Sequence, residues 1–156
     1  MDPLKDHTFI HGDLGKKATV EEIVKALNGR RADVVLADVM APTIGLKMED
    51  HLNSMQGCLF AGRVMERTLA PGGWFICKLL WGVEQQHWRL YLESRFDTVR
   101  TIKPPASRPV HREMFMICRG YQGRHSIREE ATQSLPRHEG IDLWSGNTAR
   151  GQYTDE

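Results

Sequence analysis

The stretch 101-TIKPPASRPVHREMFMIC-118 decides the fold, because it joins two strand-like runs through a loop of eight to ten residues. The first run ends at Lys103-Pro104-Pro105, and the second opens at Glu113. A connection this short between neighbouring strands turns the chain back on itself, whereas parallel strands need a longer crossover. We therefore expect residues 113–118 to form a last strand that runs antiparallel to the others.

Upstream of this stretch, short apolar runs alternate with longer helical patterns. The expected strands are 8–11, which ends before Gly12-Asp13, then 32–38, 74–80 and 98–102. Residues 32–38 form a continuous apolar run that predicts a strand buried on both faces. The expected helices are 19–27, with Thr19 as its cap, 50–69 and 83–96. This alternation predicts an open α/β fold with a mostly parallel sheet and an antiparallel last strand.

Composition sets the size of the folded unit. The chain has 156 residues, of which 40% are hydrophobic and 26% charged, which fits one globular domain with a real core. After residue 121 the pattern dissolves into polar residues, glycine and proline, so we expect a domain at 1–121 and a largely disordered tail at 122–156. Residues 1–121 carry 17 basic and 14 acidic side chains, which permits a phosphate-bearing partner without requiring one.

Several classes of protein are disfavoured by the sequence. No apolar run approaches the roughly 18 to 20 residues that span a bilayer, so we expect no membrane partner. The first 25 residues lack the layout of a secretory signal or a transit peptide. The cysteines Cys58, Cys77 and Cys118 have no metal-ligand spacing, so we expect no metal site and a reducing compartment.

Four ionisable residues are expected to meet at one edge of the sheet. Asp13, Asp38 and Lys78 each stand at or next to the carboxyl end of an expected parallel strand, where ligands bind in such sheets. The last strand runs the other way, so Glu113 opens it at the same edge. Residues from four distant parts of the chain would therefore share one site.

Each of these residues also has a structural interpretation. Acids that follow strands are common helix caps and turn formers, so Asp13 and Asp38 could be structural. Glu113 could pair with Arg108 or Arg112. Lys78 could bury its stem at a sheet edge and keep its ammonium in water. A lysine inside 74-WFICKLLW-81 nevertheless needs a partner if its charge is buried, which favours a functional role.

Five segments of the sequence carry a resemblance to one family, namely 11-HGDL-14, 32-ADVVLADVMAP-42, 71-PGGWFICKLLWG-82, 103-KPPASR-108 and 112-REMFMICRG-120. Together they resemble the FtsJ (RrmJ-type) ribosomal RNA 2′-O-methyltransferases. The segment 50-DHLNSM-55 resembles the mitochondrial members, especially the fungal ones. The resemblance covers about residues 1–121 and implies the Rossmann-like fold of methyltransferases that use S-adenosylmethionine.

Carried over residue by residue, the resemblance implies a role for each candidate. Lys78 would accept the proton of a ribose 2′-hydroxyl. Asp38 would be a catalytic and cofactor-side acid, Glu113 the acid that orients the same group of residues, and Asp13 would face the adenine of the cofactor. A hydroxyl is a poor nucleophile near neutral pH, so a positioned base fits this chemistry independently of the resemblance.

The resemblance also implies partners. Large-subunit ribosomal RNA would be the substrate of a monomer, and the mitochondrion its location. Ser107, Arg108 and Arg112 lie in the loop before the last strand, where arginines could clamp phosphate. The alternative is that Arg108 pairs with a nearby acid.

The sequence departs from the family in two places. The stretch 1-MDPLKD-6 looks like the segment before the family's third strand, so we expect the first two strands, the glycine-rich cofactor loop and one catalytic lysine to be lacking. A sheet without those strands has an unpaired edge, which invites aggregation or pairing with a partner. In 38-DVMAPTIG-45, one extra residue separates Asp38 from Met-Ala-Pro.

Three hypotheses follow from these observations. The first is a methyltransferase recorded without its amino-terminal part. The second is an inactive relative that serves as an RNA-binding or ribosome-assembly factor. The third is a small α/β interaction domain with a structural charged rim, which we expect only if Lys78 lies exposed and far from Asp38 and Glu113.

Overall fold

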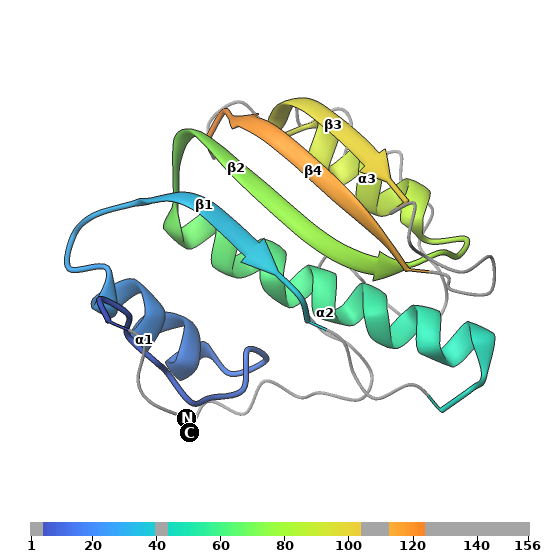
Figure 1. Ribbon diagram of the computed structural model, residues 1–156, viewed down its shortest axis with the longest axis horizontal. Coiled ribbons are helices and arrows are strands. Elements are labelled where there is room, and N and C mark those ends of the chain that lie inside the picture. Colours follow the sequence, from blue (N-terminus) through green and yellow to red (C-terminus); the bar gives the residue numbers. More distant parts are fainter. Residues whose placement is uncertain (1–4, 40–43, 104–112, 124–156) are drawn as a thin grey trace.

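The computed structural model describes residues 5–39, 44–103 and 113–123 (Figure 1). Within them, three helices and four strands follow one another along the chain. In chain order they are α1 (Lys17–Ala26), β1 (Ala32–Ala37), α2 (Lys47–Thr68), β2 (Leu69–Leu80), α3 (Gln85–Glu93), β3 (Phe96–Ile102) and β4 (Glu113–Tyr121). The expected helices and all but the first expected strand are therefore present.

The strands form one sheet in the order β1-β2-β4-β3. β1 and β2 are parallel, and β4 is antiparallel to both β2 and β3. β1, β2 and β3 therefore share one direction, which confirms the mostly parallel sheet with an antiparallel last strand. Figure 1 shows the arrowheads of β1, β2 and β3 at one edge of the sheet, where β4 begins. We call this edge the carboxyl edge.

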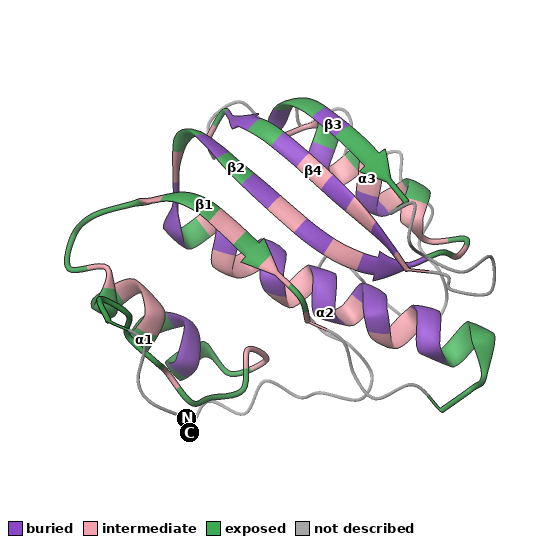
Figure 2. Cartoon of the chain, in the orientation of Figure 1, coloured by how far each residue is buried: buried purple, intermediate pink, exposed green. Residues whose placement is uncertain are grey.

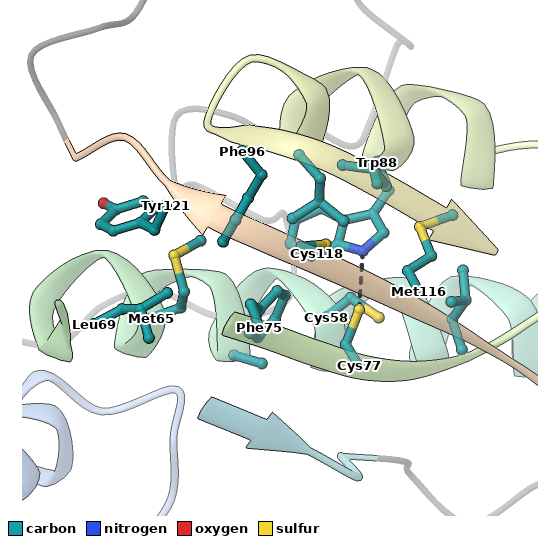
Figure 3. Packing of buried hydrophobic residues seen from close by; sticks show 14 of the residues in the cluster. Cys58, Met65, Leu69, Phe75, Cys77, Trp88, Phe96, Met116, Cys118 and Tyr121 are labelled. Carbon is teal, nitrogen blue, oxygen red and sulfur yellow. Dashed lines mark hydrogen bonds between the residues drawn. The ribbon is translucent and has the colours of Figure 1, made fainter. Parts of the chain in front are cut away.

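The core lies between one face of the sheet and helices α2 and α3. Figure 2 shows buried residues alternating with less buried ones along β2 and β4, as expected for strands with a helix layer on one face. Phe75 packs edge-on against Trp88 of α3 and is stacked with Phe96 of β3 (Figure 3). The Trp88 indole N–H donates to Cys77 Sγ at 3.4 Å, so the buried ring has a polar partner.

Local sequence accounts for the ends of these elements. Asn28 (φ 49°) and Gly29 (φ 77°) adopt the left-handed conformation that ends α1, as the sequence predicts. The register between β1 and β2 shifts where the Pro71-Gly72-Gly73 turn bulges out of β2. A Cβ on Gly73 would lie 2.8 Å from the Ala70 carbonyl oxygen, so this bulge requires glycine.

Three expectations about the first part of the chain are wrong. Residues 8–11 form no strand, because no strand within the described part of the chain lies beside them to supply hydrogen bonds. Thr19 lies inside α1 and is buried; Lys16 occupies the N-cap and makes no side-chain capping bond. β1 is not buried on both faces, since Val34 is 49% and Leu36 72% exposed. In the described structure β1 pairs only with β2. The alternate residues Val35 and Ala37 of β1 pack against the core, so Val34 and Leu36 point to the other face.

Two kinds of feature are absent from the described residues. None of their helices combines the length and the apolar character that crossing a membrane requires. No group of three or more histidine, cysteine, aspartate or glutamate side chains among them could hold a metal ion. The expected tail at 122–156 lies outside the described residues, apart from 122 and 123.

Candidate functional site

Lys78 and Asp38 form an ion pair at the carboxyl edge. Lys78 is near the end of β2, Asp38 directly follows β1, and the Lys78 ammonium contacts Asp38 Oδ1. The two strands are parallel and Ala37 pairs with Cys77, so residue 38 emerges beside residue 78. The Lys78 side chain is 14% exposed, whereas that of Asp38 is 74% exposed. A mostly buried lysine is thus neutralised by a carboxylate that solvent and ligands can reach.

Glu113 lies on the same face of the sheet as Lys78. In the antiparallel register, Lys78 is opposite Phe115 and Leu80 is opposite Glu113. Glu113 is therefore the diagonal neighbour of Lys78, with Cα atoms about 7 to 8 Å apart. Among the described residues, its side chain makes no ion pair. A ligand atom between Lys78 and Glu113 could contact both, and this geometry disfavours the third hypothesis, the structural rim.

Helix α2 braces this end of β2 through side chains that the sequence reading did not single out. Ser54 Oγ accepts from Leu80 N–H at 2.9 Å, and His51 Nδ1 lies 3.0 Å from the Leu80 carbonyl oxygen. His51 Nε2 accepts from Glu84 N–H at 3.1 Å. Since a carbonyl only accepts and an amide N–H only donates, His51 must carry its proton on Nδ1. Both side chains are 1% exposed, so they are dedicated to this anchor.

Two further contacts position the strand ends. Cys58 Sγ donates to the Lys78 carbonyl oxygen at 3.5 Å, and a hydrogen bond with Cys77 raises the pKa of Cys58, which keeps the donor protonated. Gly57 lets α2 approach the chain just after Asp38, because a Cβ there would lie 2.5 Å from the Val39 carbonyl oxygen. α2 therefore fixes both members of the ion pair from behind the sheet.

The other candidates are not part of this pair. Asp13 lies in the turn before α1, where its Oδ1 accepts from Gly15 N–H at 2.8 Å. Asp13 is exposed, and its hydrogen bond to Gly15 is typical of a turn-forming residue. The structural interpretation of Asp13 therefore has direct support, whereas its cofactor role stays a prediction. Ser107, Arg108 and Arg112 lie outside the described residues.

The described residues can be tested against S-adenosylmethionine, the cofactor that the family resemblance implies. Asp38 offers an exposed carboxylate beside Lys78, which suits the positive charge and hydrogen-bond donors of that molecule. Gly72 and Gly73 lie in the bulge at the beginning of β2, at the opposite end of the strand from Lys78, so they do not form a nucleotide loop at the carboxyl edge. The described residues thus fit the reacting end of the cofactor, with Asp38 as the group to hold it.

Comparison with known proteins identifies relatives of the chain. The sequence profile of FtsJ-like methyltransferases matches residues 1–121. The chain is 38% identical over 124 residues to ribosomal RNA large subunit methyltransferase E of Parvibaculum lavamentivorans, covering 80% of this chain and 48% of that protein. It is 33% identical over 120 residues to the protein of the same name in Acinetobacter baumannii, with coverage of 77% and 56%. The chain thus spans about half the length of these relatives.

One solved structure resembles the described fold. A protein described as a ribosomal RNA methyltransferase from Plasmodium falciparum superposes with a TM-score of 0.69 at 32% identity. The match covers 80% of this chain and 69% of the other. It supports the Rossmann-like assignment of the four-stranded sheet.

Proposed function

Because the chain belongs to the FtsJ-like methyltransferase family, we propose that it transfers a methyl group from S-adenosylmethionine to a ribose 2′-hydroxyl of ribosomal RNA. The observation that carries this proposal is the mostly buried Lys78 held against an exposed Asp38, with Glu113 on the same face. A ribose hydroxyl needs a base beside it, and Lys78 is the one lysine within the described strands, near the carboxyl edge.

Lys78 has the central role in the proposed reaction. S-adenosylmethionine, when bound, supplies a methyl group on a positively charged sulfur. Lys78 Nζ, in its neutral form, takes the proton that the ribose oxygen loses as that oxygen bonds the methyl carbon and the carbon–sulfur bond breaks. Asp38 then stabilises the ammonium that Lys78 has become, since an adjacent opposite charge favours the charged form.

Glu113 orients the reacting hydroxyl in this proposal. Its place diagonal to Lys78 allows its carboxylate to accept from a ribose hydroxyl while Lys78 contacts the same sugar.

The finer parts of the proposal rest on the family. We propose that the substrate is large-subunit ribosomal RNA, that Ser107, Arg108 and Arg112 contact its phosphates, and that the protein acts as a monomer. We also propose a mitochondrial location, supported by the resemblance of 50-DHLNSM-55 to mitochondrial members.

The first test replaces Lys78. Methyl transfer from radiolabelled S-adenosylmethionine to unmethylated ribosomal RNA should fall about 100- to 10,000-fold in Lys78→Ala, because the general base is lost. Lys78→Arg should be nearly as inactive, because a guanidinium stays protonated and cannot accept the proton. Lys25→Ala, an exposed lysine of α1, is the matched control and should retain wild-type activity. Full activity in Lys78→Ala would remove the lysine from the base role.

The second hypothesis, an inactive RNA-binding or ribosome-assembly factor, is favoured by one observation. Among the described residues, no glycine-rich turn lies at the carboxyl edge to hold the nucleotide part of the cofactor. Calorimetry with S-adenosylmethionine distinguishes the two, since the enzyme must bind the cofactor. Cofactor binding by this chain would count against the inactive factor.

A further inference from the structure

The loop between β2 and α3 presents an exposed aromatic side chain shortly after the proposed base. Trp81 is 56% exposed and Val83 is 74% exposed. Trp81 follows Lys78 by three residues, so the two Cα atoms are at most about 10 Å apart along an extended chain. This distance is of the order of the spacing between neighbouring nucleotides of an RNA strand.

Hydrogen bonds from α2 hold both ends of this loop. The Leu80 N–H and carbonyl are bonded to Ser54 and His51, and Glu84 N–H is bonded to His51 on the other side of the turn. Gly82 packs directly on the His51 ring, because a Cβ at this position would lie 2.2 Å from His51 Cγ. Two buried polar side chains and one obligatory glycine therefore fix the segment that carries Trp81.

The acidic side chain of the loop, Glu84, is paired with a histidine. The carboxylate of Glu84 is bonded to His87 Nδ1 at 2.7 Å and is only 12% exposed, so its charge is partly shielded from an approaching phosphate. Rigid aromatic side chains bind unpaired bases by stacking, and they tolerate any base because every base has a π face. Sequence-specific RNA proteins likewise use splayed, unpaired bases as their targets.

We propose that Trp81 is a base-stacking platform for an unpaired nucleotide next to the one whose ribose faces Lys78, and that His51 is its positioning residue. The inference rests on the proposed function, because it takes RNA as the substrate. It adds that the acceptor nucleotide lies in a single-stranded or splayed segment. Trp81 contributes affinity and register, while Lys78 contributes the chemistry.

The test measures RNA affinity of the full chain by fluorescence anisotropy. The probes are a mixed-sequence single-stranded RNA of about 12 nucleotides and the same RNA annealed to its complement. Trp81→Ala should weaken binding of the single strand about 5- to 150-fold, the range expected for losing one stacked base. Trp81→Phe should keep most of the affinity, and the duplex should bind both variants as it binds the wild type.

Trp74→Ala is the matched control. Trp74 is 40% exposed and lies in the middle of β2, four residues before Lys78, where Arg119 lies over its ring at 5.5 Å. This variant should bind the single strand like the wild type. Equal weakening by Trp74→Ala, or equal weakening for the duplex, would overturn the platform, because it would show a general effect on the fold. Unchanged binding by Trp81→Ala would also overturn the platform, and a protein partner would then be the alternative ligand of this loop.

Methyl transfer, measured on the same proteins, separates this inference from the proposed function. If the wild type methylates RNA and Trp81→Ala does not change the RNA affinity, the stacking platform is rejected and the enzymatic function is kept. Trp81-dependent RNA affinity without any methylation keeps the platform and rejects the enzyme. Absence of RNA binding by the wild type rejects both.

Discussion

Asp38 is the residue at which stability and chemistry can be separated. Its side chain is 74% exposed although that of Lys78 is only 14% exposed, so solvent screens the pair from the Asp38 side and limits its contribution to stability to about 1 kcal/mol. We therefore expect Asp38→Asn to change the free energy of unfolding by less than about 1 kcal/mol. Methyl transfer should fall about 100-fold, because the ammonium formed on Lys78 loses its stabilising charge. Urea denaturation and methyl-transfer assays on one preparation measure both quantities.

A control for this prediction lies on the same strand. Asp33 is exposed near the beginning of β1, away from the carboxyl edge, so Asp33→Asn should leave both stability and methyl transfer unchanged. A large loss of stability in Asp38→Asn would show that the Lys78 pair is structural. Unchanged methyl transfer would show that Asp38 takes no part in the reaction.

Residues of the site differ in how far the sequence could predict them. Lys78 stands out because it interrupts an apolar strand, and strand direction alone places Asp38 and Glu113 near it. His51 and Ser54 were missed, although their spacing of three puts them on the same side of a helix as the core residue Met55. Their partners are backbone groups of β2, and no sequence pattern shows which backbone groups a buried polar side chain will meet.

Elements were easier to predict than their surroundings. The apolar runs and helical spacings located β1 to β4 and all three helices, since periodicity reflects which face of each element is buried. Residues 8–11 show that an apolar pattern alone does not make a strand. Their composition suits a strand, but a strand needs a neighbouring strand for its hydrogen bonds, and the described sheet has none in that place. The exposure of Val34 and Leu36 has the same origin, because burial depends on what covers a strand.

The hydrogen bonds between the beginning of α2 and the end of β2 support a prediction at the level of elements. Replacing His51 by phenylalanine keeps the ring size similar but removes both hydrogen bonds, which takes this partner from Leu80 C=O in a buried place and from Glu84 N–H in a partly buried one. Each orphaned group costs about 1 to 3 kcal/mol, so we expect His51→Phe to lower the free energy of unfolding by about 2 to 5 kcal/mol. Urea titration followed by far-UV circular dichroism measures the change.

His87 provides the comparison for this experiment. It is also a histidine at the β2–α3 connection, but its Nδ1 bonds the Glu84 carboxylate and not the backbone. Its side chain is 22% exposed, so water can replace the lost partner in His87→Phe. We expect a loss of about 1 kcal/mol or less. Similar losses in both variants would mean that His51 has no special anchoring role.

The whole molecule should lose stability at alkaline pH, because folding buries groups in their neutral form. Burial raises the pKa of Cys118 above its ordinary value of 9.0 and the pKa of Tyr91 above its ordinary value of 10.0. Above these values the unfolded chain releases protons that the folded chain retains. The stabilisation is therefore complete below about pH 9 and is lost as the pH rises, by up to about 1.4 kcal/mol per pH unit for each group.

Denaturant titrations at several pH values between about 7 and 11, with reductant present, measure this decline, and two substitutions assign it. Cys118→Ala removes the thiol, and Tyr91→Phe removes the phenol together with its hydrogen bond to Glu66 at 2.7 Å. Each variant should be less stable than the wild type at neutral pH, because one loses core packing and the other a hydrogen bond. Each should nevertheless lose less stability between neutral and alkaline pH. If the decline has the same slope in the wild type and in both variants, then groups other than these two control the alkaline unfolding of the core.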